Sequence, residues 1–570
     1  MPGALILRKK LFFGLVILFT SVAVTQAQIG YIAKLDLDWR ITTSYFNPRF
    51  GRYAPVLVSD DWSVIGLDSA YSAATSSNRA VRWTRAGGTQ DLGTFGSQGS
   101  GMGTMSKDGS VIFGGSNMPG SSVQTGFRWT AGSGMVPYTE TWSYALYNTD
   151  RTTVVTTDRH AGAADIFARY DGSSLVRSGN VAGGFQVQAN LLAGNWVTTF
   201  GQSINGSAAH AVRWDGVAGS PVQDIGTLGG LTAEVQYTNT DGTVAFGRSN
   251  KANGSSQAFR WTAAGGMQDV TSSAFAASSF AFMNASATSG FGTLEPSSGY
   301  RTFHWSDSGG YTDIGSLGSG NLTANKYALD GNSLVGITAA TLFGNPIAVR
   351  WSKPTGLVNI GFTNMSAITY AGGSEDLTVL LYKTVSTSNQ QKLYRVTGNN
   401  VLTDMGQLDG SVLSVYETSK DASKMLVTSA SKMYFWDDVT GFHDMGIVNG
   451  VQIDKNSNQI VESPTFDLVA GSVKVGITNY AWVYSPQIGS RDLKSLLMTN
   501  GADLTNWDSL NQVDLIEDVN GVAYVTGLGT YNGVNGFKFY AAVPEPTSVL
   551  GVTAGILFLL RRRNSSKNPA

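Results

Sequence analysis

The side chains that most often carry catalysis or bind metals are scattered through this sequence. Its four histidines show no His-Glu-x-x-His or comparable spacing; they are His160, His210, His304 and His443. The chain has no cysteine, which excludes thiolate metal sites, cysteine nucleophiles and disulfides. We therefore expect structural or surface roles for the histidines, and we predict no catalytic residue, no metal site and no cofactor.

Other chemical motifs are absent or incomplete. The sequence has no Gly-x-Ser-x-Gly nucleophile elbow and no phosphate-binding Gly-x-x-x-x-Gly-Lys-Ser/Thr loop, which argues against a serine hydrolase or a nucleotide enzyme. Asp454, Asn456 and Asn458 alternate as calcium ligands do. However, Gln459 stands where the loop needs glycine, and Glu462 comes too early for the bidentate ligand. We interpret this segment as a solvated turn.

Paired carboxylates for glycoside chemistry cannot be located from the sequence, because the distance between two of its 40 acidic residues is not readable there. Asp108, Asp241 and Asp330 each precede glycine at equivalent places of a repeat, which favours turn capping over catalysis. A catalytic pair would be expected to interrupt the repeat. The irregular segment LEPSSGYRTFHW, from Leu294, is therefore the first place to search for one.

The composition favours an exported, β-rich chain. Charged residues make up 14% and aromatic residues 11%, and there are 69 glycines against 14 prolines. The formal net charge of -1 gives no overall attraction to nucleic acid, so we expect no nucleic-acid partner. A length of 570 residues exceeds the usual single domain, although repeat architectures can form one larger body.

A phrase with arginine next to an aromatic residue recurs along the chain, as in AVRWTRAGGTQDLGTFG from Ala80 and AFRWTAAGGMQDV from Ala258. The aromatic anchors, or their equivalents, recur every 40 to 48 residues: Trp83, Trp129, Tyr170, Trp214, Trp261, Trp305, Trp351, Val396, Trp436 and Tyr484. A second phrase alternates with the first and opens at Asp60, Asp108, Asp241, Asp330 and Asp421. Such spacing is typical of a repeat architecture.

Each repeat contains four short segments typical of β-strands. In the fifth repeat they open at Thr243, Ser256, Gly266 and Ser278, and turn residues bound each of them. We predict an all-β fold, a β-propeller of about ten to eleven repeats of roughly 45 residues, as one large ring or two tandem rings. A β-solenoid is the alternative. The best helical candidate is RDLKSLLMTNG, from Arg491.

The arginine of the phrase is expected to pair with an aspartate nine residues later. A symmetric hairpin with a two-residue loop would place the two side chains opposite each other. A buried arginine needs such a partner, and we expect the tryptophans to set stability and the charge pairs to set register. The predicted pairs are Arg82–Asp91, Arg260–Asp269 and Arg395–Asp404.

The repeats resemble the HAF family of extracellular repeat proteins. The tripeptide that gives the family its name is similar to His210-Ala211-Val212 and Gln257-Ala258-Phe259, and the likeness continues through DIGTLGG and DIGSLGSG. It covers most of the chain from about residue 60 to 542, including a closing segment at 485–542. The resemblance implies export and a β-propeller at residues 28–542, and it carries no established chemistry.

The two ends of the chain look like export signals. Residues 1–27 have Arg8, Lys9 and Lys10 ahead of an apolar run and a cut site after Ala27, as in a secretory signal peptide. An uncleaved anchor helix is the alternative.

At the other end, a Pro-Glu-Pro motif precedes the short apolar segment 549–560 and a basic cluster. This tail resembles the PEP-CTERM sorting signal, at residues 543–563, with a cytoplasmic tail at 564–570. The resemblance implies transient membrane attachment and processing by an exosortase. The signal residues are Val543, Pro544, Glu545, Pro546, Arg561, Arg562 and Arg563.

These patterns favour a non-enzymatic protein of the bacterial cell envelope or extracellular matrix. Its propeller loops would contact an extracellular polysaccharide or surface proteins. One alternative is a glycan-acting hydrolase or lyase on a propeller scaffold, with its site on the central face. The other alternative is a self-assembling or adhesion module. An acidic cluster on one face would favour the enzyme, and an aromatic rim would favour binding.

Overall fold

The computed structural model describes the chain in segments. These are residues 30–35, 45–47, 52–54, 56–72, 77–96, 99–120, 124–138, 145–158, 165–170, 174–181, 186–271, 275–295, 300–315, 317, 321–339, 345–454 and 457–544. The chain divides into two compact units: unit 2 is Leu57–His443, and unit 1 is Met1–Val56 with Asp444–Ala570. The expected signal peptide (1–27), Glu545, Pro546, Arg561 to Arg563 and residues 564–570 lie outside the described residues.

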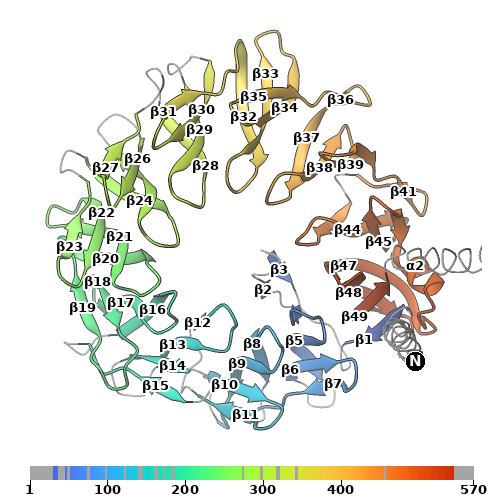
Figure 1. Cartoon of the computed structure of the whole chain (residues 1–570). Helices are drawn as coiled ribbons and strands as arrows, with labels where there is room; N and C mark the ends of the chain where they lie inside the picture. Colours follow the sequence, from blue (N-terminus) through green and yellow to red (C-terminus); the bar gives the residue numbers. More distant parts are fainter. Residues whose placement is uncertain are drawn as a thin grey trace, which may run out of the picture. The chain divides into compact units, whose positions relative to one another are not determined.

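Unit 2 is built from antiparallel sheets that follow one another in the sequence (Figure 1). Each set contains four strands in chain order, except the last, which contains five. The strands are formed by β-branched, aromatic and small residues between turns rich in glycine, serine and aspartate. The first four sets are β4 (Val56–Val58), β5 (Val64–Ser72), β6 (Ser77–Thr84) and β7 (Gly88–Asp91); β8 (Ser100–Met105), β9 (Val111–Asn117), β10 (Gln124–Thr130) and β11 (Gly134–Pro137); β12 (Ala145–Tyr147), β13 (Val154–Asp158), β14 (Ile166–Tyr170) and β15 (Leu175–Arg177); and β16 (Gln186–Leu192), β17 (Thr199–Asn205), β18 (Ala208–Trp214) and β19 (Gln223–Gly226).

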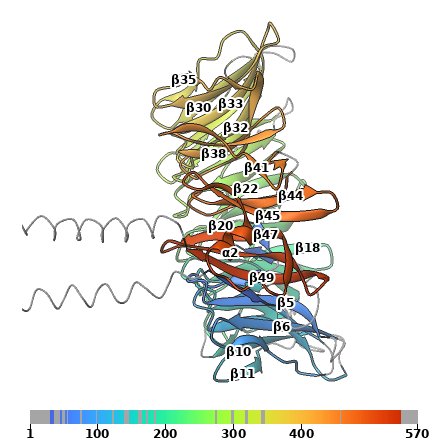
Figure 2. The same ribbon diagram turned by 90° about the vertical axis from the view of Figure 1, so that its right-hand side faces the viewer.

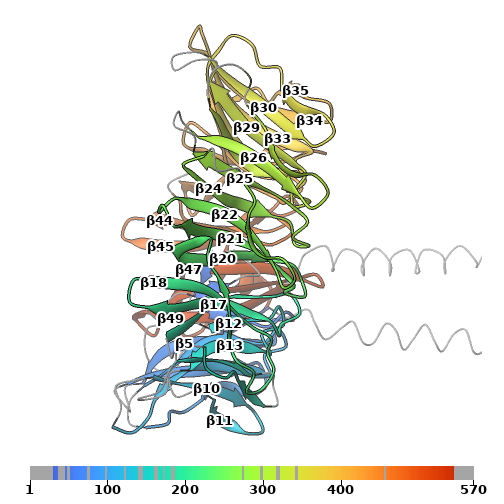
Figure 3. The ribbon, with the colours of Figure 1, turned by 90° about the vertical axis from the view of Figure 1, so that its left-hand side faces the viewer.

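The remaining sets continue this order, and consecutive sheets lie next to one another (Figure 3). They are β20 (Gly229–Thr238), β21 (Val244–Lys251), β22 (Ser256–Thr262) and β23 (Gly266–Asp269); β24 (Ala277–Met283), β25 (Ser289–Glu295), β26 (Arg301–Ser306) and β27 (Gly310–Asp313); β28 (Leu322–Tyr327), β29 (Ser333–Ala339), β30 (Pro346–Ser352) and β31 (Gly356–Asn359); β32 (Met365–Gly373), β33 (Val379–Ser386), β34 (Gln391–Thr397) and β35 (Val401–Asp404); and β36 (Gln407–Leu408), β37 (Ser411–Thr418), β38 (Lys424–Ser429), β39 (Lys432–Asp437) and β40 (Gly441–Asp444). One parallel bridge joins β18 to β20.

This succession of four-stranded sheets confirms the all-β, propeller-like prediction at the level of the sheets. The four strands predicted for one repeat do not all belong to one sheet, because the sheets begin one strand earlier in the chain than the predicted repeats do. The strands that open at 243, 256 and 266 belong to one sheet, but the strand near Ser278 is β24 of the next sheet, and β20 completes the first. The reason is that connections within and between sheets are all short and rich in turn residues, so the sequence does not mark where a sheet ends.

The predicted tryptophan anchors lie in the apolar layers between consecutive sheets. All seven are at most 8% exposed: Trp83, Trp129, Trp214, Trp261, Trp305, Trp351 and Trp436. Trp351, for example, shares a cluster with Phe291 of the preceding sheet, and their ring centroids are 5.5 Å apart. Each buried indole removes about 150 to 250 Å² from water, so these anchors are a main source of stability.

Unit 1 contains two four-stranded sheets and one described helix (Figure 2). The expected helix near Arg491 is α2 (Leu493–Thr499), which begins where the Asp492 carboxylate accepts a hydrogen bond from the Ser495 amide. The strands are β1 (Tyr31–Lys34), β2 (Tyr45–Asn47), β3 (Arg52–Ala54), β41 (Ile447–Val448), β42 (Val451–Gln452), β43 (Asn458–Glu462), β44 (Val469–Val475), β45 (Thr478–Ser485), β46 (Gly489–Asp492), β47 (Trp507–Val519), β48 (Val522–Tyr531) and β49 (Val534–Pro544).

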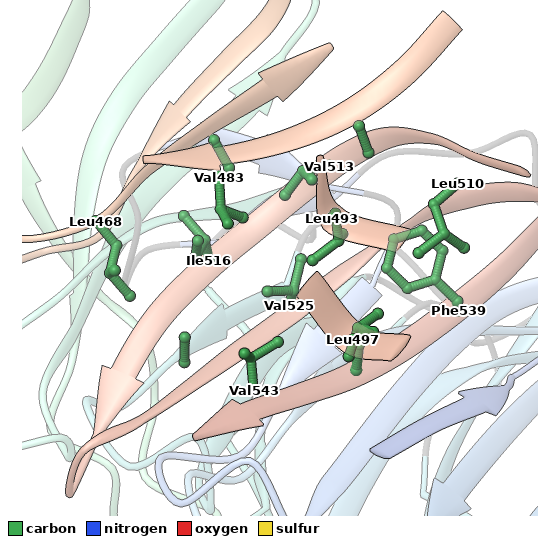
Figure 4. Close-up of a cluster of buried hydrophobic side chains, with 14 of the residues drawn as sticks. Leu468, Val483, Leu493, Leu497, Leu510, Val513, Ile516, Val525, Phe539 and Val543 are labelled. Carbon is green, nitrogen blue, oxygen red and sulfur yellow. The ribbon is translucent and has the colours of Figure 1, made fainter. Parts of the chain in front are cut away.

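The last sheet has the order β1-β49-β48-β47, so a strand from the start of the chain completes it. One face packs on a core that includes Leu493, Leu497, Val525 and Phe539 (Figure 4). Val543, the first residue of the expected sorting motif, is 4% exposed in this core. Among the described residues no helix is both long and apolar enough to cross a bilayer, and segment 549–560 lies outside them.

Candidate functional site

The hairpin register contradicts the predicted arginine–aspartate pairs. Arg82 lies opposite Gln90, and Asp91 lies opposite Val81. The hairpin joins Thr84 to Gly88 through three residues rather than two, with Gly88 at a φ of +64°. A three-residue loop with a left-handed glycine shifts the register by one residue, which turns the two side chains to opposite faces of the hairpin.

The same shift occurs in the other two predicted pairs, which are also wrong. Arg260 lies opposite Gln268, and Arg395 lies opposite Thr403. Consequently Asp269 and Asp404 lie opposite Phe259 and Tyr394 and have other charged partners.

The arginines instead contact the aromatic anchor of the following sheet. The guanidinium carbon lies 5.6 Å from the ring centroid in Arg82–Trp129 and 5.9 Å in Arg260–Trp305. Arg395–Trp436 has the same arrangement at 5.4 Å. Burial lowers the pKa of Arg82, yet the Arg82 Nε has no hydrogen-bond partner among the described atoms. Each arginine therefore joins two sheets by a cation–π contact and does not pair with the predicted aspartate; Arg260 also lies 3.4 Å from an Asp307 oxygen.

In several repeats the aspartate of the phrase pairs with a basic residue four positions before the anchor position, whereas Asp269 pairs with Lys251. Lys392 Nζ lies 2.7 Å from Asp404 Oδ2, and Arg301 NH1 lies 2.7 Å from Asp313 Oδ2. The histidine of the His-Ala-Val tripeptide occupies this position too, since His210 Nδ1 is 2.8 Å from an Asp224 oxygen. The other oxygen of the same aspartate accepts a hydrogen bond from the amide two residues later, at the start of the next turn.

The aspartates of the second repeat phrase cap their own turns, as the sequence predicted. Asp108 and Asp241 each accept a hydrogen bond of 3.0 Å from the amide two residues later. The Asp330 carboxylate accepts the equivalent hydrogen bond from the Asn332 amide at 2.8 Å. Hydrogen bonds from serine or threonine hydroxyls are the largest cause of the lowered pKa of Asp108 and Asp241. These carboxylates therefore hold their own turns in place.

The same turns also connect neighbouring sheets, which the sequence did not reveal. The Glu375 amide donates to the Lys420 carbonyl at 2.8 Å, one repeat further along the chain. The Asn195 amide donates in the same way to the Thr240 carbonyl at 2.6 Å. The turns are therefore linked along one edge of the row of sheets.

A pocket of about 530 Å³ lies among three successive turns of this edge. Glu375 and Lys420 face each other there, with 3.9 Å between Oε1 and Nζ, and both side chains are exposed. Leu329 is 60% exposed and adds an apolar surface. The carboxylates and the amine that line the pocket belong to Asp330, Glu375, Asp376, Asp421 and Lys420.

His304, in the segment singled out from the sequence, forms a buried pair with a serine. Its Nε2 lies 2.9 Å from Ser289 Oγ, and the side chains are 2% and 5% exposed. Ser289 Oγ also donates toward the Gly331 carbonyl of the next sheet, at 2.9 Å. The His304 ring lies tilted against Trp351, with 4.7 Å between ring centroids, so histidine takes the place that arginine has in other repeats.

Burial and the nearby Lys353 ammonium lower the pKa of His304 to about 4. The neutral imidazole resembles a general base next to a hydroxyl. However, the serine is occupied at the junction of two sheets and is closed to substrate, so we assign the pair a structural role. His443 lies at a hairpin next to Thr440, and His160 lies outside the described residues.

No group of three potential metal ligands occurs within the part of the chain that the structure describes. Asp454 of the calcium-like segment belongs to no such group; it forms hydrogen bonds with Ser457 within a turn.

No family model and no curated protein matches the sequence. Among solved structures, dipeptidyl peptidase 4 of Porphyromonas gingivalis aligns at 10% identity and a TM-score of 0.34, over 74% of this chain and 64% of the peptidase. A eukaryotic initiation factor aligns at 8% identity and a TM-score of 0.34, over 74% of this chain and 94% of the factor. Oligogalacturonate lyase of Vibrio parahaemolyticus aligns at 11% identity and a TM-score of 0.27, over 61% and 98%. The chain thus spans less than two thirds of the peptidase.

Proposed function

We propose that this protein is a non-enzymatic, exported repeat protein of the bacterial cell envelope or extracellular matrix. It binds a hydroxyl-rich polysaccharide at the edge formed by its linked turns. The proposal includes a propeller of about ten to eleven sheets in one or two rings, a signal peptide at residues 1–27, and an exosortase-processed signal at 543–563 that attaches the chain briefly to the membrane.

The pocket between the turns supports the binding role. Its carboxylates accept hydrogen bonds from hydroxyl groups, the Lys420 ammonium donates them, and Leu329 offers an apolar contact to the C–H face of a sugar ring. Three of the four carboxylates are already held by their turns, so little side-chain freedom is lost when a ligand binds.

A glycan-acting hydrolase or lyase is the second candidate, because carboxylates converge in this pocket. The protonation states of two of these carboxyl groups argue against an enzyme that needs a general acid. Hydrogen bonds, led by those from Ser374 and Ser419, lower the pKa of Asp376 and Asp421, so neither carboxyl carries a proton near neutral pH. Asp330 and Glu375 are then the remaining carboxyl groups of the pocket, and Asp330 already caps its own turn, so we take Glu375 as the candidate for a general acid.

Binding of the purified full chain to extracellular polysaccharide, measured by calorimetry, tests the proposal. The double variant Glu375→Gln, Lys420→Met changes two exposed side chains that cap no turn, and we expect affinity to fall about tenfold or more. Val439→Ser, at an 89% exposed position elsewhere in unit 2, is the matched control and should bind normally.

Equal affinity in the double variant and the control would contradict the proposed site. Release of new reducing ends or unsaturated sugars, abolished by Glu375→Gln alone, would establish the enzyme instead.

A further inference from the structure

The last sheet of unit 1 carries a lysine and an aspartate on the face opposite its apolar core. Val513 and Phe539 point into that core (Figure 4). Lys538 precedes Phe539 in a regular strand, so its side chain lies on the other face. Asp514 is the extra residue of a β-bulge between Val513 and Leu515, which frees its side chain from the strict alternation.

These two side chains meet across the intervening strand β48. Lys538 Nζ contacts Asp514 Oδ2, and the side chains are only 2% and 5% exposed. The Gln512 side-chain amide donates to the other carboxylate oxygen, Oδ1, at 2.6 Å. A primary amine, a carboxyl group and a hydrogen-bond donor to that carboxyl are therefore held together away from water.

This environment favours a neutral product over two ions. Removing an ammonium and a carboxylate from water has a large free-energy cost, which their mutual attraction only partly offsets. An amide carries no net charge and avoids that cost. We propose that Lys538 and Asp514 condense to an intramolecular isopeptide bond.

The reaction needs no oxidant, reductant or co-reactant. One proton passes from the Lys538 ammonium to the Asp514 carboxylate, and the free amine then attacks Cγ. A C–N bond forms, and Oδ1 carries the negative charge of the tetrahedral intermediate, where the Gln512 N–H donates to it. The C–Oδ2 bond breaks, and that oxygen leaves as water with two of the three ammonium protons, which leaves one proton on the amide nitrogen.

The bond would tie the two strands on either side of β48 and close a segment of 24 residues in a chain without cysteine. β49 is also the last described strand before the C-terminal tail. A pull on that tail would peel β49 from its neighbours one hydrogen bond at a time, and the covalent link would stop the separation at Lys538.

Mass spectrometry of the purified, folded protein tests the proposal. We expect an intact mass lower by one water molecule than the sequence of the same chain requires. Cleavage after glutamate should leave the peptide 463–517 joined to the peptide that begins at residue 518, because cleavage after Glu517 separates Asp514 from Lys538 only in an unlinked chain.

Lys251 and Asp269 supply the matched control. Their atoms lie 2.5 Å apart, but the side chains are 25% and 18% exposed, so we expect no bond between them. No glutamate lies between the two residues, so the single peptide that contains both should keep its full mass.

The variant Lys538→Arg keeps the charge and lacks a nucleophilic amine. It should show the full mass, separate peptides and a thermal midpoint lower by several degrees. Wild-type protein with the full mass and separable peptides would overturn the proposal, whether or not the variant folds.

Discussion

The buried His304 predicts that the junction between its sheet and the next weakens in acid. The pKa of a histidine in an unfolded chain is near 6.5, and burial in the folded protein lowers the pKa of His304 to about 4. Between these values the unfolded chain binds more protons than the folded one, so the free energy of unfolding decreases as the pH falls. The stabilisation is complete above pH 6.5 and is lost as the pH approaches 4.

The magnitude follows from the same two pKa values. Between pH 7 and pH 5 the linkage relation gives a loss of about 2 kcal/mol from this one residue. Burial is the largest cause of the lowered pKa, and the Lys353 ammonium adds to it by opposing a second positive charge. The Gly331 backbone and the Asp330 carboxylate compensate only in part. The Ser289 hydroxyl can hydrogen-bond to either protonation state.

The variant His304→Gln isolates this contribution, because glutamine keeps a side-chain hydrogen-bonding group and does not titrate. Urea unfolding of both proteins across pH 4.5 to 7 should show a stability difference that changes by about 2 kcal/mol. Hydrogen exchange, corrected for the intrinsic pH effect, should place the added opening at β25, β26 and the turn before β29. A constant difference across this pH range, or a His304 signal, assigned by its loss in the variant, that titrates near 6.5 in the folded protein, would refute the reasoning.

Two further predictions concern the turns and the charge pairs. Gly331 has a φ of +74°, and a Cβ there would lie 2.4 Å from the Ser289 carbonyl oxygen, so Gly331→Ala should lower the unfolding free energy by about 2 to 3 kcal/mol in urea titrations. Gly134→Ala, at a φ of +65° in open space, should cost only about 1 kcal/mol, and equal losses would contradict the role of the clash. A double-mutant cycle should find no coupling between Arg395 and Asp404 but measurable coupling between Lys392 and Asp404.

The apolar layers between the sheets could be predicted from the sequence. An aromatic anchor that recurs every 40 to 48 residues is expected to occupy the same buried place in each repeat. Trp214 and Trp261 are buried as expected. The capping role of Asp241 could also be predicted, since aspartate before glycine bonds to its own backbone.

The charged partners could not be predicted in the same way. The loop before Gly88 is one residue longer than assumed, and this moved Asp91 from the predicted Arg82 to a position opposite Val81. No pattern in the sequence distinguished the two loop lengths, because both tolerate glycine at this position.

The pocket could not be predicted from the sequence either, although two of its aspartates, Asp330 and Asp421, were recognised as part of a repeat. Glu375 and Lys420 are 45 residues apart and become neighbours only because the turns of successive sheets bond to each other. The contact of Lys538 with Asp514 has a similar origin, since it depends on a bulge and on the order of strands in the last sheet.

The sequence by itself determined the succession of short strands, the turns between them and the buried aromatic layers. These depend on local alternation and on periodic repetition, which are visible in one dimension. The tertiary structure decided which polar side chains meet. A shift of one residue turns a side chain to the other face of a sheet, and the nearest partner can belong to the next sheet, a whole repeat away.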